Sequence, residues 1–113
     1  CFVNRNTRLP MMFMDDAIRA TLELMDSPLE SLNYHSNYNL SSMSFSAEEL
    51  EKEISAHLDF NCFYKPDYRQ DIADTWPISI NDEDARKDWG WEPKFDISKM
   101  TEEMITNLRR LNE

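Results

Sequence analysis

The chain has 113 residues, with 22 acidic and 12 basic side chains and a formal net charge of −10. That charge repels a phosphate backbone, so we expect no DNA or RNA partner. No apolar run approaches the roughly 20 residues of a membrane-spanning helix, so we expect no membrane partner either.

The amino-terminal part of the chain predicts a strand, a helix and a second strand. Cys1 to Val3 have strand character and the chain does not open with methionine, so we expect a piece of a longer protein that continues upstream. Apolar side chains recur at helical spacing across residues 15–26, which predicts a helix with one buried face. Those side chains are Ile18, Leu22 and Met25, and Ala17, Ala20 and Leu24 widen the stripe. Residues 37–40 again have strand character.

A capping box marks the start of the next helix. The Ser46 hydroxyl and the Glu49 carboxylate are spaced so that each satisfies a backbone donor of the other, which predicts a helix from Ala47. Its expected buried face is Leu50, Ile54, His57 and Leu58. Residues 61–65 are predicted to be a short strand that Pro66 closes, and residues 75–80 are predicted to be extended because residues before a proline avoid the helical region.

Two helices close the chain. Gly90 follows the helical run 83–89, so we predict that it ends this helix in the left-handed conformation. Asn81 or Asp82 would cap the start of that helix, and Asp96 would cap the next one. The apolar stripe of the last helix is Ile97, Met100, Met104, Leu108 and Leu111. This alternation of strands and helices favours an α/β or α+β unit without an internal domain break.

Several residue patterns that build cofactor and metal sites are missing from the sequence. A chain of this length carries about eight glycines on average, and a loop that cradles a dinucleotide phosphate needs several close together. Only one glycine is present. Cys1 and Cys62 form no metal-ligand spacing or disulfide framework, and His35 and His57 stand alone. We therefore expect no metal site, and free thiols in a reducing, intracellular compartment.

Two pairs of charged residues leave alternatives open. Arg8 and Arg69 flank apolar stretches, where a guanidinium usually recognises a carboxylate or a phosphate. The residues alone fit an internal ion pair and a ligand contact equally well. Asp15 and Asp16 fit a general acid and base pair, but carboxylates at a helix start also complement the positive end of the helix dipole. We favour the second interpretation for these two carboxylates.

Four segments together resemble the extended short-chain dehydrogenases and epimerases. They are residues 7–21, 38–40, 69–77 and 85–93, and the last has the Gly-Trp-x-Pro ending of that superfamily. Four short sequences within and near these segments are similar to the NAD-dependent L-threonine 3-dehydrogenases of the short-chain type. They are Leu-Pro-Met-Met-Phe-Met, Met-Ser-Phe, Ile-Ala-Asp-Thr-Trp-Pro and Asp-Trp-Gly-Trp. The resemblance covers nearly the whole chain.

The resemblance implies an α/β fold in which residues 1–113 are the carboxy-terminal, substrate-binding region. The NAD-binding Rossmann domain would lie upstream. The reaction would convert L-threonine to 2-amino-3-oxobutanoate in threonine catabolism, with NAD as cofactor. The family's catalytic Tyr-x-x-x-Lys pair is not in this chain, because none of its tyrosines is followed by a lysine four positions later. We therefore expect no catalytic or cofactor-binding residue here, and no activity from this part alone.

The same resemblance implies five substrate-binding residues. Arg8 and Arg69 fall where related epimerases place two diphosphate-binding arginines. Trp76 falls where a pocket-gating aromatic sits, and a bulky indole suits a small amino acid better than a nucleotide sugar. Leu9 and Pro10 would shape the adjacent loop. Because L-threonine has no diphosphate, Arg8 would gate the pocket and Arg69 would brace the loop.

Two alternative functions stay open on the sequence. The chain could be the carboxy-terminal part of a nucleotide-sugar epimerase or dehydratase. It could also be a non-catalytic acidic interaction module that docks a partner through its terminal amphipathic helix. For the enzyme, we expect a homodimer in the cytoplasm, or in the mitochondrial matrix if the source is eukaryotic.

Overall fold

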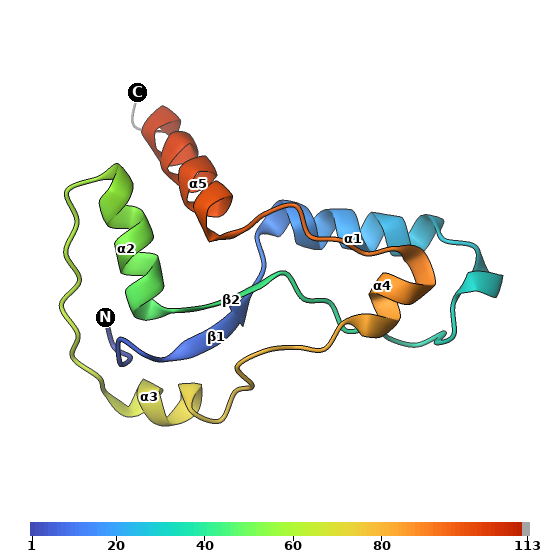
Figure 1. Ribbon diagram of the computed structural model, residues 1–113, viewed down its shortest axis with the longest axis horizontal. Helices are drawn as coiled ribbons and strands as arrows, with labels where there is room; N and C mark the ends of the chain where they lie inside the picture. The colour runs from blue at the N-terminus through green and yellow to red at the C-terminus, as the bar shows by residue number, and fades with distance from the viewer. Residues whose placement is uncertain (112–113) are drawn as a thin grey trace.

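The computed structural model describes residues 1–111 and has the mixed helix and strand content that the sequence predicts. The elements in chain order are β1 (Arg8–Met11), α1 (Met14–Asp26), the short 3-10 helix η1 (Leu29–Ser31), β2 (Met43–Ser46), α2 (Ala47–His57), α3 (Tyr68–Ala73), α4 (Glu83–Trp89) and α5 (Ile97–Leu111). Figure 1 shows the two strands in the middle, with α1 and α4 at one end and α2 and α5 at the other. No helix within residues 1–111 is long and apolar enough to cross a membrane.

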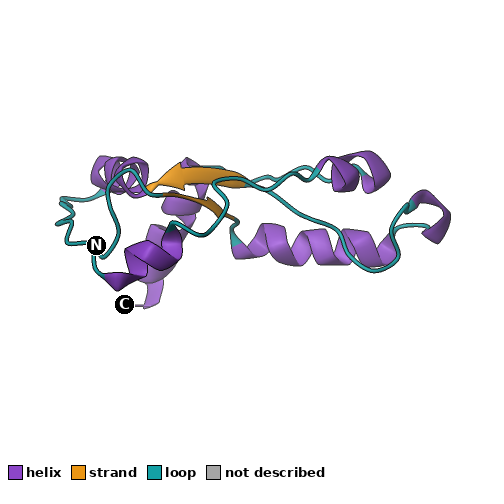
Figure 2. Cartoon of the chain, turned by 90° about the horizontal axis from the view of Figure 1, so that it is seen from below, coloured by secondary structure: helices purple, strands orange, loops and turns teal. Residues whose placement is uncertain are grey.

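The molecule is flat and extended, with dimensions of 50 × 38 × 18 Å (Figure 2). Its radius of gyration is 16.8 Å, whereas a compact chain of this length has about 13 Å. Its accessible surface is 8182 Å², against about 6,500 Å² for a folded monomer of the same mass. The elements therefore leave an unusually large area uncovered.

The two strands β1 and β2 form an antiparallel pair in which Leu9 faces Phe45 and Pro10 faces Ser44. A proline is tolerated in β1 because a two-stranded sheet has only edge strands. The strands that the sequence predicted at residues 1–3, 37–40 and 61–65 are wrong, because these segments form no ladder in the described chain. The extended backbone predicted for residues 75–80 is wrong at its start, because Thr75 lies in a turn and Trp76 in a bend after α3. Strand character fixes an extended backbone, but a ladder also needs a neighbouring strand in register.

The first and third of these extended segments do lie side by side. The backbone N–H of Lys65 donates to the Cys1 carbonyl at 2.9 Å, and that of Asp67 donates to the Phe2 carbonyl at 3.3 Å. These isolated bonds connect the start of the chain to the segment that precedes α3.

Helix α1 forms where the sequence predicts it, but its predicted buried face is only partly confirmed. Ala20 of the predicted stripe is fully buried, whereas Ile18, Leu22 and Met25 are 53%, 55% and 74% exposed and Asp16, outside the stripe, is fully buried. The chain that covers α1 runs from α4 to α5 and lies against the side that carries Asp16 (Figure 1). The large apolar side chains of this stripe, Ile18, Leu22 and Met25, consequently face away from the rest of the described chain.

The predicted capping box of α2 is confirmed. The Ser46 hydroxyl accepts a bond from the Glu49 N–H at 3.2 Å, and the Glu49 carboxylate accepts one from the Ser46 N–H at 2.7 Å. The predicted buried face is wrong, because no α2 residue is buried. Leu58 is 41% exposed, and His57 lies on the surface beside Glu53. The apolar side of α2 has too few neighbours to cover it.

The ends of the last two helices follow the sequence prediction. Gly90 ends α4 with a φ of 73°, in the left-handed region. Asp82 is the N-cap residue of α4 without a side-chain capping bond, and the side-chain oxygen of Asn81, one residue earlier, accepts a bond from the Glu83 N–H at 2.9 Å. Asp96 caps α5 through a 2.9 Å bond from the Lys99 N–H. The apolar stripe of α5 is largely exposed, however, and Thr101 is the α5 residue that is buried.

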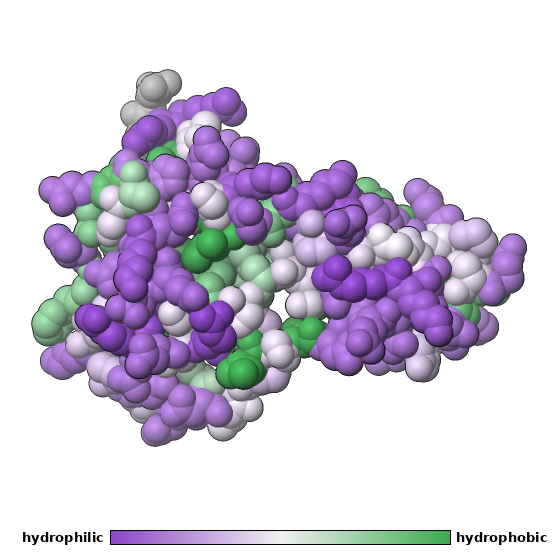
Figure 3. All heavy atoms as spheres, viewed as in Figure 1, coloured by the Kyte–Doolittle hydropathy of each residue, from purple (hydrophilic) through white to green (hydrophobic). Residues whose placement is uncertain are grey.

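The buried core is small and lies between α1 and α4. It is formed by Ala20, Ala85 and Trp91, with partly buried neighbours that include Tyr38 and Leu40. On the face that Figure 3 shows, apolar side chains reach the surface in the middle of the molecule. The chain therefore has one well-packed region and several apolar faces that are not covered within residues 1–111.

Candidate substrate pocket

A cavity of about 330 Å³ lies between the start of β1, helix α3 and the segment after α3. It is lined by Asn4, Asn6, Thr7, Arg8, Gln70, Ala73, Asp74, Trp76 and Ile78. We refer to it as the β1–α3 pocket. It brings together Arg8 and Trp76, which are two of the five predicted substrate-binding residues. It has a polar wall before β1 and a partly apolar wall after α3.

Arg8 lies in the β1–α3 pocket and also forms an internal ion pair. Its guanidinium donates to the Ser44 carbonyl at 2.5 Å and to the Glu49 carboxylate at 2.6 Å. The pKa of Glu49 is lowered, first by the Ser46 backbone N–H and then by Arg8. The guanidinium has five N–H donors, so these two bonds leave further donors for a ligand. Both alternatives left open for Arg8 therefore fit its position.

Arg69 lies outside the β1–α3 pocket. Its guanidinium donates to both oxygens of Asp67, at 3.0 Å and 2.6 Å, and stacks 3.6 Å from the centre of the Phe2 ring. Hydrogen bonds from its side chain and backbone lower the pKa of Asp67 to about 2. The internal ion pair is therefore the arrangement found for Arg69, and it connects α3 to the start of the chain.

The remaining predicted residues occupy three different places. Trp76 is 58% exposed and lines the β1–α3 pocket. Leu9 faces Phe45 across the strand pair and is half-buried. Pro10 lines a separate cavity of about 90 Å³ that also contains Met12 and Leu40. The structure thus brings Arg8 and Trp76 together and places Leu9, Pro10 and Arg69 outside the pocket.

Sequence reasoning missed Gln70, which lies at the boundary of the pocket. Its side chain is hydrogen-bonded to Thr7 and Asp74 and is 9% exposed. The available signal was a glutamine next to Arg69 and after Asp67, which caps α3 with its side chain. Helix α3 has only six residues, so no apolar periodicity could predict it.

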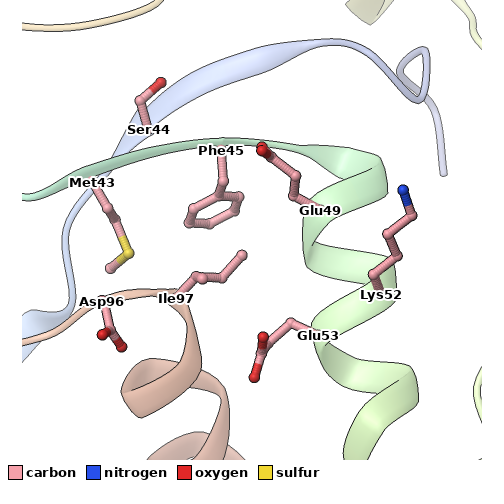
Figure 4. Close-up of a pocket in the computed structure, with 8 residues that line it drawn as sticks. All are labelled: Met43, Ser44, Phe45, Glu49, Lys52, Glu53, Asp96 and Ile97. Atoms are coloured by element: carbon pink, nitrogen blue, oxygen red, sulfur yellow. The ribbon is translucent and has the colours of Figure 1, made fainter.

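A second cavity, of about 460 Å³, lies between β2, α2 and α5. Figure 4 shows Met43, Phe45 and Ile97 facing one another across it, while Ser44 points away. Its polar residues are Glu49, Lys52, Glu53 and Asp96. Residues 1–111 contain no group of three or more acidic, histidine or cysteine side chains arranged to hold a metal ion. This cavity contains none of the predicted substrate-binding residues.

Asp16 has a structural role that neither sequence interpretation describes fully. Its carboxylate is buried and accepts bonds from the backbone N–H groups of Lys94 and Phe95, each at about 3.0 Å, and from Arg19 at 2.9 Å. Burial raises the pKa of Asp16, but these bonds outweigh it, so the net pKa is lowered. All of its partners are internal, which makes Asp16 an anchor between α1 and the segment before α5 and not half of an acid and base pair.

Comparison with known proteins assigns the chain to a family, although no protein-family model matches it. The mitochondrial L-threonine 3-dehydrogenase of Bos taurus is 47% identical over 107 residues, which are 93% of this chain and 28% of that protein. A solved structure of a metagenome-derived monomeric L-threonine 3-dehydrogenase is 96% identical, with a TM-score of 0.95 over 100% of this chain and 37% of that one. The chain has the fold of the carboxy-terminal part of an extended short-chain dehydrogenase. Another structure of this family, the holo form of a GalE-like L-threonine dehydrogenase from Cupriavidus necator, is 44% identical with a TM-score of 0.92 over 96% of this chain and 35% of that one.

The extended short-chain dehydrogenase fold that the sequence resemblance implied is therefore confirmed. The chain spans about a third of the length of the curated relatives that it matches. Some of these relatives are named uncharacterized epimerase/dehydratase. The homodimer expectation gains no support, because the neighbour that is 96% identical is named a monomeric enzyme.

Proposed function

We propose that this chain is the substrate-covering part of an NAD-dependent L-threonine 3-dehydrogenase, which converts L-threonine to 2-amino-3-oxobutanoate. The observation that carries the proposal is the 96% identity and 0.95 TM-score over the whole chain with an enzyme of that name. The β1–α3 pocket, at about 330 Å³, is at the small end of the usual range of ligand pockets, which is about 300 to 1,000 Å³. A small amino acid suits such a pocket.

The residues of this chain do not fit an NAD-binding loop. Gly90 is the single glycine of the chain and ends α4, whereas a phosphate-binding loop places several glycines at the start of a helix. We therefore propose that NAD and the catalytic tyrosine and lysine belong to a domain upstream of this region. The large uncovered surface supports such a second domain, because the exposed apolar stripes of α1 and α5 need a partner surface.

The chain's own residues would bind and orient the substrate. A free N–H of Arg8 can donate to the substrate carboxylate, with the fork geometry that a guanidinium provides. Trp76 and Ile78 form the apolar side of the pocket and would exclude water from the hydroxyl-bearing carbon. Holding the substrate in one orientation is how such a region would contribute to rate. Arg69 would brace the segment before α3 from outside the pocket.

A nucleotide-sugar epimerase or dehydratase is the second candidate, because several relatives have epimerase/dehydratase names. One observation favours the threonine enzyme over it. Only one arginine, Arg8, lines the β1–α3 pocket, while the guanidinium of Arg69 is paired with Asp67 outside it. A diphosphate clamp built from both arginines would require Arg69 to leave that pair. The acidic interaction module has no comparable support, because the named relatives are enzymes.

The proposal is tested by assaying the full-length protein that contains this chain. We expect reduction of NAD with L-threonine and none with a nucleotide sugar. Turnover of a nucleotide sugar without turnover of L-threonine would assign the epimerase function instead. As a matched control, the isolated 113-residue chain should show no binding of NAD by calorimetric titration. Saturable binding of NAD to that chain would contradict the assignment of the cofactor to an upstream domain.

The assembly and location of the enzyme are separate proposals. Sedimentation of the full-length protein would distinguish the homodimer from the monomer that the name of the metagenome-derived enzyme indicates. For a eukaryotic source we propose the mitochondrial matrix, and the name of the bovine relative supports a mitochondrial location; for a bacterial source we propose the cytoplasm. Fractionation of the source cells tests this.

A further inference from the structure

The side chain of Gln70 joins the two walls of the β1–α3 pocket. Its amide oxygen accepts bonds from the Asn4 backbone N–H at 2.7 Å and from the Thr7 hydroxyl at 3.1 Å. Its amide nitrogen donates to the Thr7 hydroxyl at 3.0 Å and to the Asp74 carboxylate at 2.6 Å. A primary amide has two donors and two acceptor lone pairs, so all four are used.

The partners also fix which way the amide is oriented. The Asn4 N–H can only donate and the Asp74 carboxylate, when ionised, can only accept. The amide oxygen must therefore face Asn4 and the nitrogen must face Asp74. Thr7 can serve both atoms because a hydroxyl donates and accepts. Rotating the amide by 180° would place its N–H groups opposite the Asn4 N–H and its oxygen opposite the Asp74 carboxylate, and both hydrogen bonds would be lost.

These bonds connect residues that are far apart in the sequence. The turn that begins at Asn4 closes through a 3.0 Å bond from the Thr7 N–H to the Asn4 carbonyl, and Arg8 follows at once. Helix α3 is followed by Trp76, whose backbone N–H donates to the Ala73 carbonyl at 3.1 Å. Gln70 therefore lies between the wall that carries Arg8 and the wall that carries Trp76.

Apolar packing does not provide a substitute for these bonds. The buried apolar residues of the described chain are Ala20, Phe45, Ala85 and Trp91. None of them lines the β1–α3 pocket. The separation of the two walls consequently depends on polar contacts, and among these Gln70 contacts both sides.

We propose that Gln70 is a positioning residue that sets the distance and orientation between Arg8 and Trp76 for the substrate. This inference rests on the proposed function, because it assigns the β1–α3 pocket to the substrate. Gln70 acts through Asn4, Thr7 and Asp74 and not by contact with the reacting atoms. Its loss should therefore change substrate fit more than the chemical step.

The test uses the full-length protein with Gln70→Met, which keeps the length of the side chain and removes the amide. We expect KM for L-threonine to rise by on the order of tenfold, with a smaller change in kcat, because a pocket wall that moves loses orientation. Selectivity against longer 3-hydroxy amino acids should fall at the same time. The matched control is Asp71→Asn, on the exposed side of α3, which should leave both quantities unchanged.

A second pair of variants distinguishes positioning from general loss of structure. Gln70→Glu places a carboxylate against Asp74, so the donor in that bond is lost and KM should rise as with Gln70→Met. The double variant Gln70→Glu/Asp74→Asn restores a donor and an acceptor in reversed order and should recover most of the loss in KM. If Gln70→Met does not fold, Thr7→Val removes the hydroxyl from the same network and should give a smaller change in the same direction.

Hydrogen exchange gives a readout that does not depend on the substrate. In Gln70→Met the amide of Asn4 and the turn to Thr7 should exchange faster, while the β1–β2 ladder keeps its protection. Unchanged exchange at Asn4, or an unchanged KM and selectivity in Gln70→Met and Gln70→Glu, would overturn the role of Gln70. Failure of the wild-type protein to oxidise L-threonine would instead overturn the proposed function, and hydrogen exchange would still decide whether Gln70 holds the two walls together.

Discussion

Two regions of this molecule are held together in different ways. Between α1 and α4, Ala20, Ala85 and Trp91 are almost completely buried, and the carboxylate of Asp16 accepts bonds from two backbone N–H groups. Around the β1–α3 pocket no apolar residue is fully buried, and the side chain of Gln70 is hydrogen-bonded to both walls.

The difference has a physical consequence for each region. Burial of a large aromatic ring and of a fully hydrogen-bonded carboxylate makes local opening costly, so the α1–α4 region should be rigid. A region connected by a few hydrogen bonds, with little buried apolar surface, opens at a lower free energy. A pocket that must admit and release a substrate is better placed in the second region than in the first.

The largest expected effect is that of Trp91→Ala. The indole is 1% exposed, donates to the Ser41 carbonyl at 2.9 Å and lies 4.7 Å below the Arg19 guanidinium. Truncation should lower the free energy of unfolding by about 3 to 5 kcal/mol, because it leaves a cavity in the small core. Urea unfolding of the full-length protein measures this. Trp76→Ala is the matched control, and an equal loss in both variants would remove the distinction between the two regions.

Asp16→Asn should give the second largest loss of stability. An asparagine keeps the shape but turns an N–H group toward backbone donors, so we expect a loss of about 2 to 4 kcal/mol. Asp15→Asn, at an exposed position of the same helix turn, should change the free energy of unfolding by less than about 0.5 kcal/mol. Equal effects of the two changes would show that Asp16 acts only through the helix dipole.

The stabilisation by Asp16 should also depend on pH. Its pKa in the folded protein is lowered, so the unfolded chain binds the proton more tightly and stability falls as the pH drops. The contribution is complete above the unfolded pKa of about 3.9 and is lost as the pH falls below it. The gap in unfolding free energy between the wild type and Asp16→Asn should therefore narrow in acid. A gap that stays constant down to about pH 2 would contradict this.

Arg8→Lys should affect activity more than stability. Lysine keeps the charge but loses the planar fork of the guanidinium. We therefore expect kcat/KM for L-threonine to fall, by an amount that corresponds to a loss of about 1 to 3 kcal/mol of transition-state stabilisation. The melting temperature should change little, because the pair with Glu49 is partly exposed, with side chains that are 37% and 48% accessible. Arg5→Lys, in the exposed pair with Glu48, is the matched control. A large drop in melting temperature with normal activity per folded molecule would make Arg8 purely structural.

Trp76→Ala should have its main effect on substrate selection. Removing the indole enlarges the β1–α3 pocket and admits water, so turnover of L-threonine should fall. The kcat/KM of longer 3-hydroxy amino acids should rise about tenfold relative to that of L-threonine. Steady-state kinetics across a series of such substrates measure the change. If Trp76→Ala leaves the kinetic constants unchanged for every substrate in the series, the indole does not contact the substrate and the selection role of Trp76 is wrong.

The sequence by itself determined the local features of this protein. The capping box at Ser46, the helix end at Gly90 and the cap at Asp96 depend on residues within about one helical turn, so the sequence contains all the information that they need. The family resemblance also depends on short segments that can be read in order along the chain. Arg8 and Trp76 were found in this way, as two of the residues that line one pocket.

The tertiary structure alone decided which surfaces meet. The pairing of β1 with β2, the burial of Asp16 in place of Ile18, and the bonds of Gln70 all join residues that are far apart in the sequence. Apolar periodicity shows that a helix has an apolar face, but the partner of that face lies on another segment of the chain. The same limit applies in part to Arg69. Its ion-pair partner Asp67 is two residues away, but its stacking on the Phe2 ring joins segments that are far apart in the sequence.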